Sequence, residues 1–199
     1  TARCCLAYDD AFLELATDSL VLEICRLLLG EYVVLTQQNA IVNPPSRAHT
    51  QRSYHRDLPY QHFTSSRPIA VSALLCVDAF AASNGATIVV PGSHKMEEFP
   101  SDAVLAATEQ PVEAPAGSYI IFDAMVSHRA GVNASTTVRR AVNHVYALPF
   151  VAPQISFPSM LRGRHADDAA LARLLGYETQ SASSVNEWRE RRRARQRSV

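Results

Sequence analysis

The chain has 199 residues, of which 47% are hydrophobic and 19% are charged, and its formal net charge is zero. These values are typical of an ordinary globular protein with one substantial core. No apolar run approaches the roughly 18–20 residues of a membrane-spanning helix, and the first residues lack the pattern of a signal peptide, so we expect neither.

The four cysteines show no Cys-x-x-Cys spacing, and three of them lie in the apolar N-terminal segment, where small buried thiols are expected. They are Cys4, Cys5, Cys25 and Cys76. A disulfide framework is therefore not expected, and a reducing compartment, the cytoplasm, fits the chain best.

Residues 1–30 are predicted to be helical, because their apolar residues recur at helical spacing. Asp18 or Ser19 is suited to begin the second helix and Gly30 to end it. Residues 31–150 then read as short strands separated by turn signals, which favours a sandwich or barrel over alternating βαβ units. The expected strands cover residues 32–42, 54–58, 69–77, 85–90, 118–123 and 138–148, with a short helix over 102–108.

Residues 151–199 are predicted to form a helical extension that packs outside the sheets, with helices over 160–164, 167–175 and a final Arg-rich segment that begins at the capping box Ser184–Glu187. Six arginines and one acid lie between Arg189 and Arg197. Removing them from the totals of 19 and 19 leaves 13 basic and 18 acidic residues, so the body carries a net charge of −5. A basic tail of this kind can touch nucleic acid, but a solvated helix end is the simpler interpretation, and nucleic acid is not expected as a partner.

The most informative pattern joins His55 and Asp57 to a distant His128. In a strand, residues two apart point to the same face, so His55 and Asp57 present an imidazole and a carboxylate together. With a second imidazole they form a 2-His-1-carboxylate set, which suits non-haem Fe(II) that must also bind a cosubstrate and O₂. We predict that these three residues bind a metal; taken alone, His-x-Asp is also compatible with an exposed strand and a local ion pair.

Arg139 lies eleven residues after His128, close enough to bind the remote carboxylate of a 2-oxoacid. Its planar guanidinium grips a carboxylate through two hydrogen bonds and stays charged when desolvated. Arg140 is the alternative, although one step along a strand reverses the face. Together these residues predict an Fe(II)/2-oxoglutarate dioxygenase.

Several ordered blocks between about Glu31 and Phe150 resemble the phytanoyl-CoA dioxygenase family. They are Tyr54-His55-Arg56-Asp57, Asn84-Gly85-Ala86-Thr87, Pro91-Gly92-Ser93-His94-Lys95, Ser127-His128-Arg129-Ala130-Gly131-Val132-Asn133 and Arg139-Arg140-Ala141. The resemblance implies a mainly β fold, a double-stranded β-helix (jelly-roll, cupin-like) with flanking helices. It also implies Fe(II) on His55, Asp57 and His128, with 2-oxoglutarate on Arg139 and O₂ as the oxidant. Where relatives often have Trp before the first His, this chain has Tyr54.

Other polar residues are weaker candidates. Gln37 and Asn39 share a face of the strand over residues 32–42, and relatives use polar side chains there to contact 2-oxoglutarate, so we predict that role for both. Local hydrogen bonding is the alternative. Tyr60 and His62 are candidates for the substrate pocket, whereas His94 and His144 are expected to be structural and His49 and His165 carry no signal.

The expected reaction is hydroxylation of a small organic substrate with release of succinate and CO₂. The alternatives are desaturation, epimerisation or ring formation at the same iron site, a metal-dependent cupin hydrolase or isomerase, and a non-catalytic jelly-roll binding module. Arg139 argues against the metal hydrolase, and the intact ligand set argues against the binding module. Neither the substrate nor the oligomeric state can be read from the residues.

Overall fold

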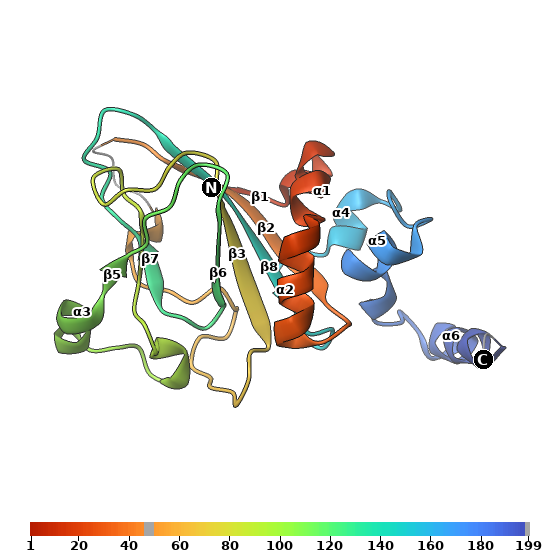
Figure 1. Cartoon of the computed structure of the whole chain (residues 1–199). Helices are drawn as coiled ribbons and strands as arrows, with labels where there is room; N and C mark the ends of the chain where they lie inside the picture. Colours follow the sequence, from red (N-terminus) through yellow and green to blue (C-terminus); the bar gives the residue numbers. More distant parts are fainter. Residues whose placement is uncertain (46–49, 198–199) are drawn as a thin grey trace.

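The computed structural model describes residues 1–45 and 50–197. Two antiparallel sheets form its centre, and helices cover the outer face of the larger sheet (Figure 1). The larger sheet has the order β1-β2-β8-β3-β6, with β1 Ala2–Arg3, β2 Val34–Asn43, β8 Arg139–Ala147, β3 Ala70–Cys76 and β6 Tyr119–Asp123. The smaller has the order β5-β4-β7, with β5 Gln110–Pro111, β4 Thr87–Val89 and β7 His128–Ala130.

Two groups of helices flank the sheets at the ends of the chain, and short helical segments lie between strands. The α-helices are α1 Ala11–Ala16, α2 Ser19–Leu29, α3 Asp102–Thr108, α4 Phe157–Leu161, α5 Ala169–Leu174 and α6 Val185–Arg197. The 3₁₀ segments are η1 Cys5–Ala7, η2 Thr50–Arg52, η3 Ser93–Lys95 and η4 Tyr177–Thr179. The jelly-roll core with flanking helices agrees with the fold class that the sequence predicts.

The start and end of α2 follow from its sequence. The side chain of Asp18 accepts a hydrogen bond from the backbone N–H of Val21 at 3.0 Å, which satisfies a free donor at the helix start. Gly30, with φ of 99°, takes a conformation that L side chains rarely adopt and ends the helix. The predicted boundaries of this helix are therefore confirmed.

The two faces of the larger sheet have different neighbours. Its outer face packs against α2, α4 and α5 through one apolar cluster, in which Leu35, Val71 and Tyr146 meet the helices. Its inner face carries a second set of apolar residues, including Leu74 and Ala141, that lies toward the smaller sheet. Alternation along β3 and β8 produces this division, since successive side chains point to opposite faces. The inner face is where the polar residues of the candidate site gather.

Three predictions differ from the structure. Within the segment 1–30 that was predicted to be helical, Ala2–Arg3 form the strand β1, which pairs with β2. Residues 54–58 do not form a strand; within the described ranges, their ladder contact is a single antiparallel bridge between His55 and His128. The C-terminal helix predicted over 160–164 lies earlier, at Phe157–Leu161, because Ser156 caps its start by accepting from Ser159 N–H and because Arg162 leaves the helical conformation at φ of 53°. The capping signal of Ser156 was present in the sequence.

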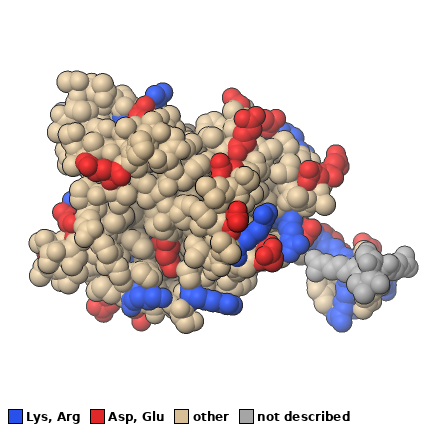
Figure 2. Space-filling model, viewed as in Figure 1, with Lys and Arg blue, Asp and Glu red and all other residues tan. Residues whose placement is uncertain are grey.

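The C-terminal helix α6 lies beyond α5, at the end of the molecule far from the sheets (Figure 1). Figure 2 shows Lys and Arg side chains there and acidic side chains scattered over the body. Arg191 pairs with Glu187 one helical turn away, and Arg192 lies over the exposed ring of Trp188. His49, which carried no functional prediction, lies outside the described residues.

Across the described residues, none of the helices has both the length and the apolar composition needed to cross a membrane. All four cysteines are buried and free.

Candidate metal centre

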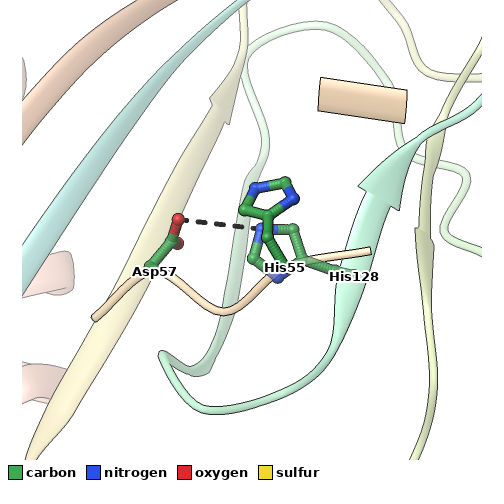
Figure 3. Close-up of side chains that lie close together, drawn as sticks. All are labelled: His55, Asp57 and His128. Atoms are coloured by element: carbon green, nitrogen blue, oxygen red, sulfur yellow. Dashed lines mark ion pairs between the residues drawn. The ribbon is translucent and has the colours of Figure 1, made fainter. Parts of the chain in front are cut away.

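His55, Asp57 and His128 come together between the two sheets (Figure 3). Each offers one ligand atom, and these atoms all lie within 4.8 Å of one another. His128 and Asp57 are largely buried, and His55 is half-buried. In the described part of the chain, this is the group of His, Cys and acidic side chains whose geometry could hold a metal ion.

Backbone hydrogen bonds position the three candidate ligands. His55 and His128 exchange two of them, each at 3.0 Å, so the first imidazole is fixed to β7. The N–H of Asp57 donates to the carbonyl of Ala124 at 2.9 Å, just after β6. The segment that carries His55 and Asp57 thus contacts the start of β7, which holds His128, and then the residue that follows β6. Because it passes from one element to the other, it forms a single bridge instead of the predicted strand.

Both imidazoles are oriented by backbone carbonyls. Nδ1 of His55 lies 3.0 Å from the carbonyl oxygen of Ser53, and Nδ1 of His128 lies 2.9 Å from that of Val126. Because a carbonyl oxygen only accepts, each Nδ1 carries the hydrogen and each Nε2 keeps a lone pair for a metal. Burial lowers the pKa of His128, which favours the neutral form that can ligate, although the nearby Asp57 opposes this shift.

Arg139 begins β8 and is 2% exposed, yet it pairs with no carboxylate among the described residues. Its Nη2 donates to the carbonyl of Gly85 at 2.7 Å, its guanidinium lies 4.3 Å from the ring centroid of Phe80, and its Nε has no hydrogen-bond partner. Burial lowers the pKa of Arg139 to about 10. A buried cation without an anion is costly, so this position is suited to receive an anionic group.

Arg140, the alternative anion anchor, points away from the site. It lies on the exposed face and makes a two-pronged pair with Asp78, with N–O distances of 2.9 and 2.8 Å. One step along β8 therefore separates a guanidinium inside the molecule from one at its surface, as strand alternation requires.

One small cavity connects the metal-ligand candidates with Arg139, and its volume is about 20 Å³. It is lined by His55, Asp57, His128, Arg139, Asn143, Ile41, Gln51, Leu74, Thr87, Arg129 and Ala130. Besides Nε of Arg139, the buried amide oxygen of Asn143 has no hydrogen-bond partner. The unpaired donor of Arg139 fits a ligand that carries a carboxylate, whereas the amide oxygen of Asn143 is an acceptor and needs a donor such as water.

Gln37 and Asn39 are buried on β2, but they do not line this cavity. The amide nitrogen of Gln37 donates to the backbone carbonyl of Asp57 at 2.6 Å, and Asn39 donates to the amide oxygen of Gln37 at 3.3 Å. Their geometry supports the backbone of the ligand segment. The cosubstrate contact that the sequence suggested for them stays a prediction.

Tyr60 and His62, the candidates for a substrate pocket, also lie outside the cavity. Both are exposed, and His62 makes edge-on ring contacts with Tyr60 and Phe99. A substrate role for them likewise stays a prediction.

The structure adds three residues to the site that the sequence did not single out. Ser72 and Asn143 both donate to the carboxylate of Asp57, at 2.6 and 3.0 Å. Arg56, between two of the ligands, turns away from them, and its guanidinium donates to the backbone carbonyls of Gln61, Ser93, Met96, Glu97 and Glu98. A polar residue within an apolar strand was the available signal for the first two; nothing local marked the partners of Arg56.

Glu109 joins the residues next to the two imidazoles, and we call this group of contacts the brace. Tyr54 and Arg129, each adjacent to a ligand in sequence, both hydrogen-bond to the carboxylate of Glu109, and Arg129 also lies over the ring of Tyr54. These contacts lower the pKa of Glu109, chiefly through the hydrogen bond from Tyr54. The brace ties the segment that carries His55 and Asp57 to β7, and its Arg129 also lines the cavity.

Comparison with known proteins finds a matching family model and several relatives. The model of the phytanoyl-CoA dioxygenase family matches residues 3–141. Two mycobacterial proteins described as uncharacterized, from Mycobacterium bovis and Mycobacterium tuberculosis, are each 31% identical over 193 residues, which cover 94% of this chain and 70% of theirs. The dioxygenase aneA of Aspergillus aculeatus is 30% identical over 140 residues, which cover 65% of this chain and 46% of the fungal protein.

Solved structures give the same fold. EvdMO1 matches with a TM-score of 0.60 and 26% identity, over 72% of this chain and 34% of its own. EctD from S. alaskensis with bound Fe matches with a TM-score of 0.65 and 21% identity, over 76% and 58%. The 2-oxoglutarate-dependent epimerase SnoN matches with a TM-score of 0.64 and 20% identity, over 78% and 66%. The chain thus spans about a third of EvdMO1 and less than two thirds of EctD.

Proposed function

Because the chain belongs to the phytanoyl-CoA dioxygenase family, we propose that it is an Fe(II)- and 2-oxoglutarate-dependent dioxygenase that hydroxylates a small organic substrate. His55, Asp57 and His128 would hold the iron, and Arg139 would bind the distal carboxylate of 2-oxoglutarate. The observation that carries the proposal is the buried, unpaired guanidinium of Arg139 in the same cavity as the three ligand candidates.

Iron bound here with 2-oxoglutarate and O₂ would supply the oxidative decarboxylation that yields succinate and CO₂ and drives oxidation of the substrate. The chain's own contribution is geometric and electrostatic. The imidazoles are held with Nε2 free by the carbonyls of Ser53 and Val126, and one end of the diacid would be held by Arg139. Ile41, Leu74 and Ala130 supply apolar walls that limit water around the reacting groups.

The cavity volume sets a condition on this function. About 20 Å³ is room for one water, so the side chains that line the cavity must move apart when 2-oxoglutarate enters. The rim residues Gln51 and Arg129 belong to short elements, η2 and β7, rather than to the long strands of the larger sheet. We infer that the cavity widens on this side.

The proposal is tested first without a substrate. Under anaerobic conditions, adding 2-oxoglutarate to the Fe(II)-loaded protein is expected to produce the visible charge-transfer absorption of a chelated 2-oxoacid, and His55→Ala and His128→Ala are expected to abolish it. Succinate release in air is then measured across a panel of small metabolites. A wild-type protein that binds Fe(II) but gives neither the charge-transfer absorption nor succinate would contradict the proposal.

Epimerisation is the second candidate outcome, because a structural relative, SnoN, is described as an epimerase dependent on the same cosubstrate. Product analysis of any substrate found in the panel separates the two reactions, since hydroxylation adds one oxygen atom to the product and epimerisation adds none.

We also propose a reducing compartment, the cytoplasm, because all four cysteines are free thiols.

A further inference from the structure

The two oxygens of the Asp57 carboxylate have different surroundings. Oδ2 accepts hydrogen bonds from Oγ of Ser72 at 2.6 Å and from Nδ2 of Asn143 at 3.0 Å. Oδ1 accepts no hydrogen bond within the described ranges, and it lies 3.7 Å from Nε2 of His128, which is beyond hydrogen-bond distance. One oxygen is therefore held by two neutral donors, while the other is left facing the imidazole (Figure 3).

The pairing of β3 with β8 brings both donors to Asp57. Ser72 lies opposite Val145, and Leu74 lies opposite Asn143, so the serine and the asparagine are diagonal neighbours on the inner face of the sheet. Ser72 is 0% exposed and Asn143 is 5% exposed. Apart from Arg139, the other inner-face positions of the two strands carry apolar residues, namely Ala70, Leu74, Cys76, Ala141, Val145 and Ala147. Buried polar groups need partners, and the carboxylate supplies one to each.

The backbone of Asp57 is fixed independently of these two donors. Its N–H donates to Ala124, and its carbonyl accepts from the amide of Gln37 at 2.6 Å. The contacts of Ser72 and Asn143 therefore act on the rotation of the carboxylate group rather than on the position of the chain. They decide which oxygen is available on the metal side.

We propose that Ser72 and Asn143 are positioning residues that make Asp57 a one-oxygen ligand of the metal. This inference rests on the proposed function, because it concerns the same ion. With Oδ2 engaged, Oδ1 alone is free to bind. A carboxylate that bound through both oxygens would occupy a further coordination position, and the chemistry of a 2-His-1-carboxylate set depends on keeping three positions open for the cosubstrate and O₂.

The test uses Co(II), a substitute for Fe(II) whose visible spectrum reports the number of its ligands. The dissociation constant for Co(II) is measured by calorimetry for the wild-type protein, Ser72→Ala, Asn143→Ala and the double variant. Loss of one hydrogen bond to a ligating carboxylate is expected to weaken binding about 10-fold, and loss of both about 100-fold. The Co(II) spectrum of the double variant is expected to change as the second oxygen of Asp57 becomes free to bind.

Two variants separate positioning from packing. Ser72→Thr keeps the hydroxyl donor and is expected to retain near wild-type affinity and spectrum. Thr36→Val on β2 removes a buried hydroxyl that donates to the carbonyl of Val145 at 3.1 Å, so it matches the loss of one buried hydrogen bond without touching Asp57. It is expected to lower the melting temperature and to leave Co(II) affinity unchanged.

The outcomes distinguish this inference from the proposed function. Unchanged Co(II) affinity and spectrum in folded Ser72→Ala and Asn143→Ala would overturn the positioning role and leave the metal site intact. A wild-type protein that fails to bind Co(II) would overturn both. The expected losses in Co(II) affinity, with no 2-oxoglutarate absorption and no succinate, would support the positioning role and count against the dioxygenase. Should the double variant not fold, the two single variants decide.

Discussion

The carbonyl oxygen of Gly85 accepts a hydrogen bond from Nη2 of Arg139 at 2.7 Å, and among the described residues it is the one hydrogen-bond partner of this buried guanidinium. Gly85 itself has φ of 80°, and a Cβ built on it would lie 2.4 Å from the amide nitrogen of Asn43 and 2.7 Å from the carbonyl of Gly131. The residue that orients the cation is thus one that tolerates no side chain. The conformation of the turn before β4 therefore fixes the carbonyl that orients Arg139 in the cavity.

Gly85→Ala is accordingly expected to lower the free energy of unfolding by about 1–3 kcal/mol, and to weaken 2-oxoglutarate binding as the carbonyl moves away from Arg139. Gly92→Ala is the matched control, because Gly92 also has φ of 80° but has no atom within 4 Å of an added Cβ. It is expected to cost less stability and to leave cosubstrate affinity unchanged. Urea unfolding and anaerobic calorimetry measure the two quantities; equal effects of both variants on affinity would contradict the argument.

Replacing Arg139 with Met is expected to change stability and binding in opposite directions. The protein without ligands should be as stable as the wild type or more stable, because an unpaired buried cation is removed. The dissociation constant for 2-oxoglutarate should rise by roughly 100-fold or more, since the diacid loses its charged partner. Arg140→Met removes only an exposed pair with Asp78 and should leave the dissociation constant unchanged. Thermal melting and calorimetry on both variants check this, and a smaller effect of Arg139→Met than of Arg140→Met would refute it.

We expect the buried imidazole of His144 to make the stability of the fold depend on pH. It is fully buried, its Nε2 lies 3.1 Å from the amide nitrogen of Gln38, and burial lowers its pKa to about 4. The unfolded chain, with a His pKa near 6.5, binds this proton more readily than the native state does. Stability contributed by neutral His144 is therefore complete above about pH 6.5 and falls as the pH drops to 4, by about 3 kcal/mol in all.

The measurement is urea unfolding of the wild type and of His144→Gln at pH 7, 5.5 and 4. The variant is expected to lose less stability between pH 7 and pH 4 than the wild type does. Acidic groups with lowered pKa values, such as Asp78 and Glu109, also contribute free energy of unfolding that is lost in acid. Both proteins contain these groups, so their contribution cancels when the two pH profiles are subtracted. Parallel pH profiles for the two proteins would show that His144 is not the group responsible.

Arg56→Lys is expected to lower the free energy of unfolding by about 3 kcal/mol. A lysine replaces a planar group that serves several backbone carbonyls at once, so acceptors in the segment 93–98 lose their donor. Since Arg56 lies between His55 and Asp57, Co(II) affinity should fall as well. Proteolysis within residues 93–99 should become faster in the variant, and a cleavage rate equal to that of the wild type would contradict this role.

The sequence predicted the parts of the site that local pattern encodes. The alternation between Arg139 and Arg140 on β8 is as predicted. His55 and Asp57 also lie together, but strand alternation is not the reason, because their segment forms an isolated bridge to His128 instead of a strand. The short strands predicted a sandwich or barrel, and the resemblance to the family implied the jelly-roll. Helix limits were right where a capping residue was recognised, as at Asp18, and wrong where Ser156 was overlooked.

What the sequence could not provide was contact between segments far apart in the chain. Ser72 and Asn143 meet at Asp57 only because β3 and β8 pair in one register, and no local pattern specifies that register. Gln37 was singled out correctly as an unusual buried amide, yet its partner turned out to be the backbone of Asp57. The partners of Arg56 were hidden for the same reason, since they depend on how a loop folds back over the chain.

The bridge between His55 and His128 joins two residues that are 73 positions apart. An ion shared by these imidazoles would act as a reversible cross-link that closes a long loop, and it would bind the native chain far better than the unfolded one. The concentration of free iron would then affect the stability of the folded protein as well as its activity, and the melting temperature would rise as that concentration increases.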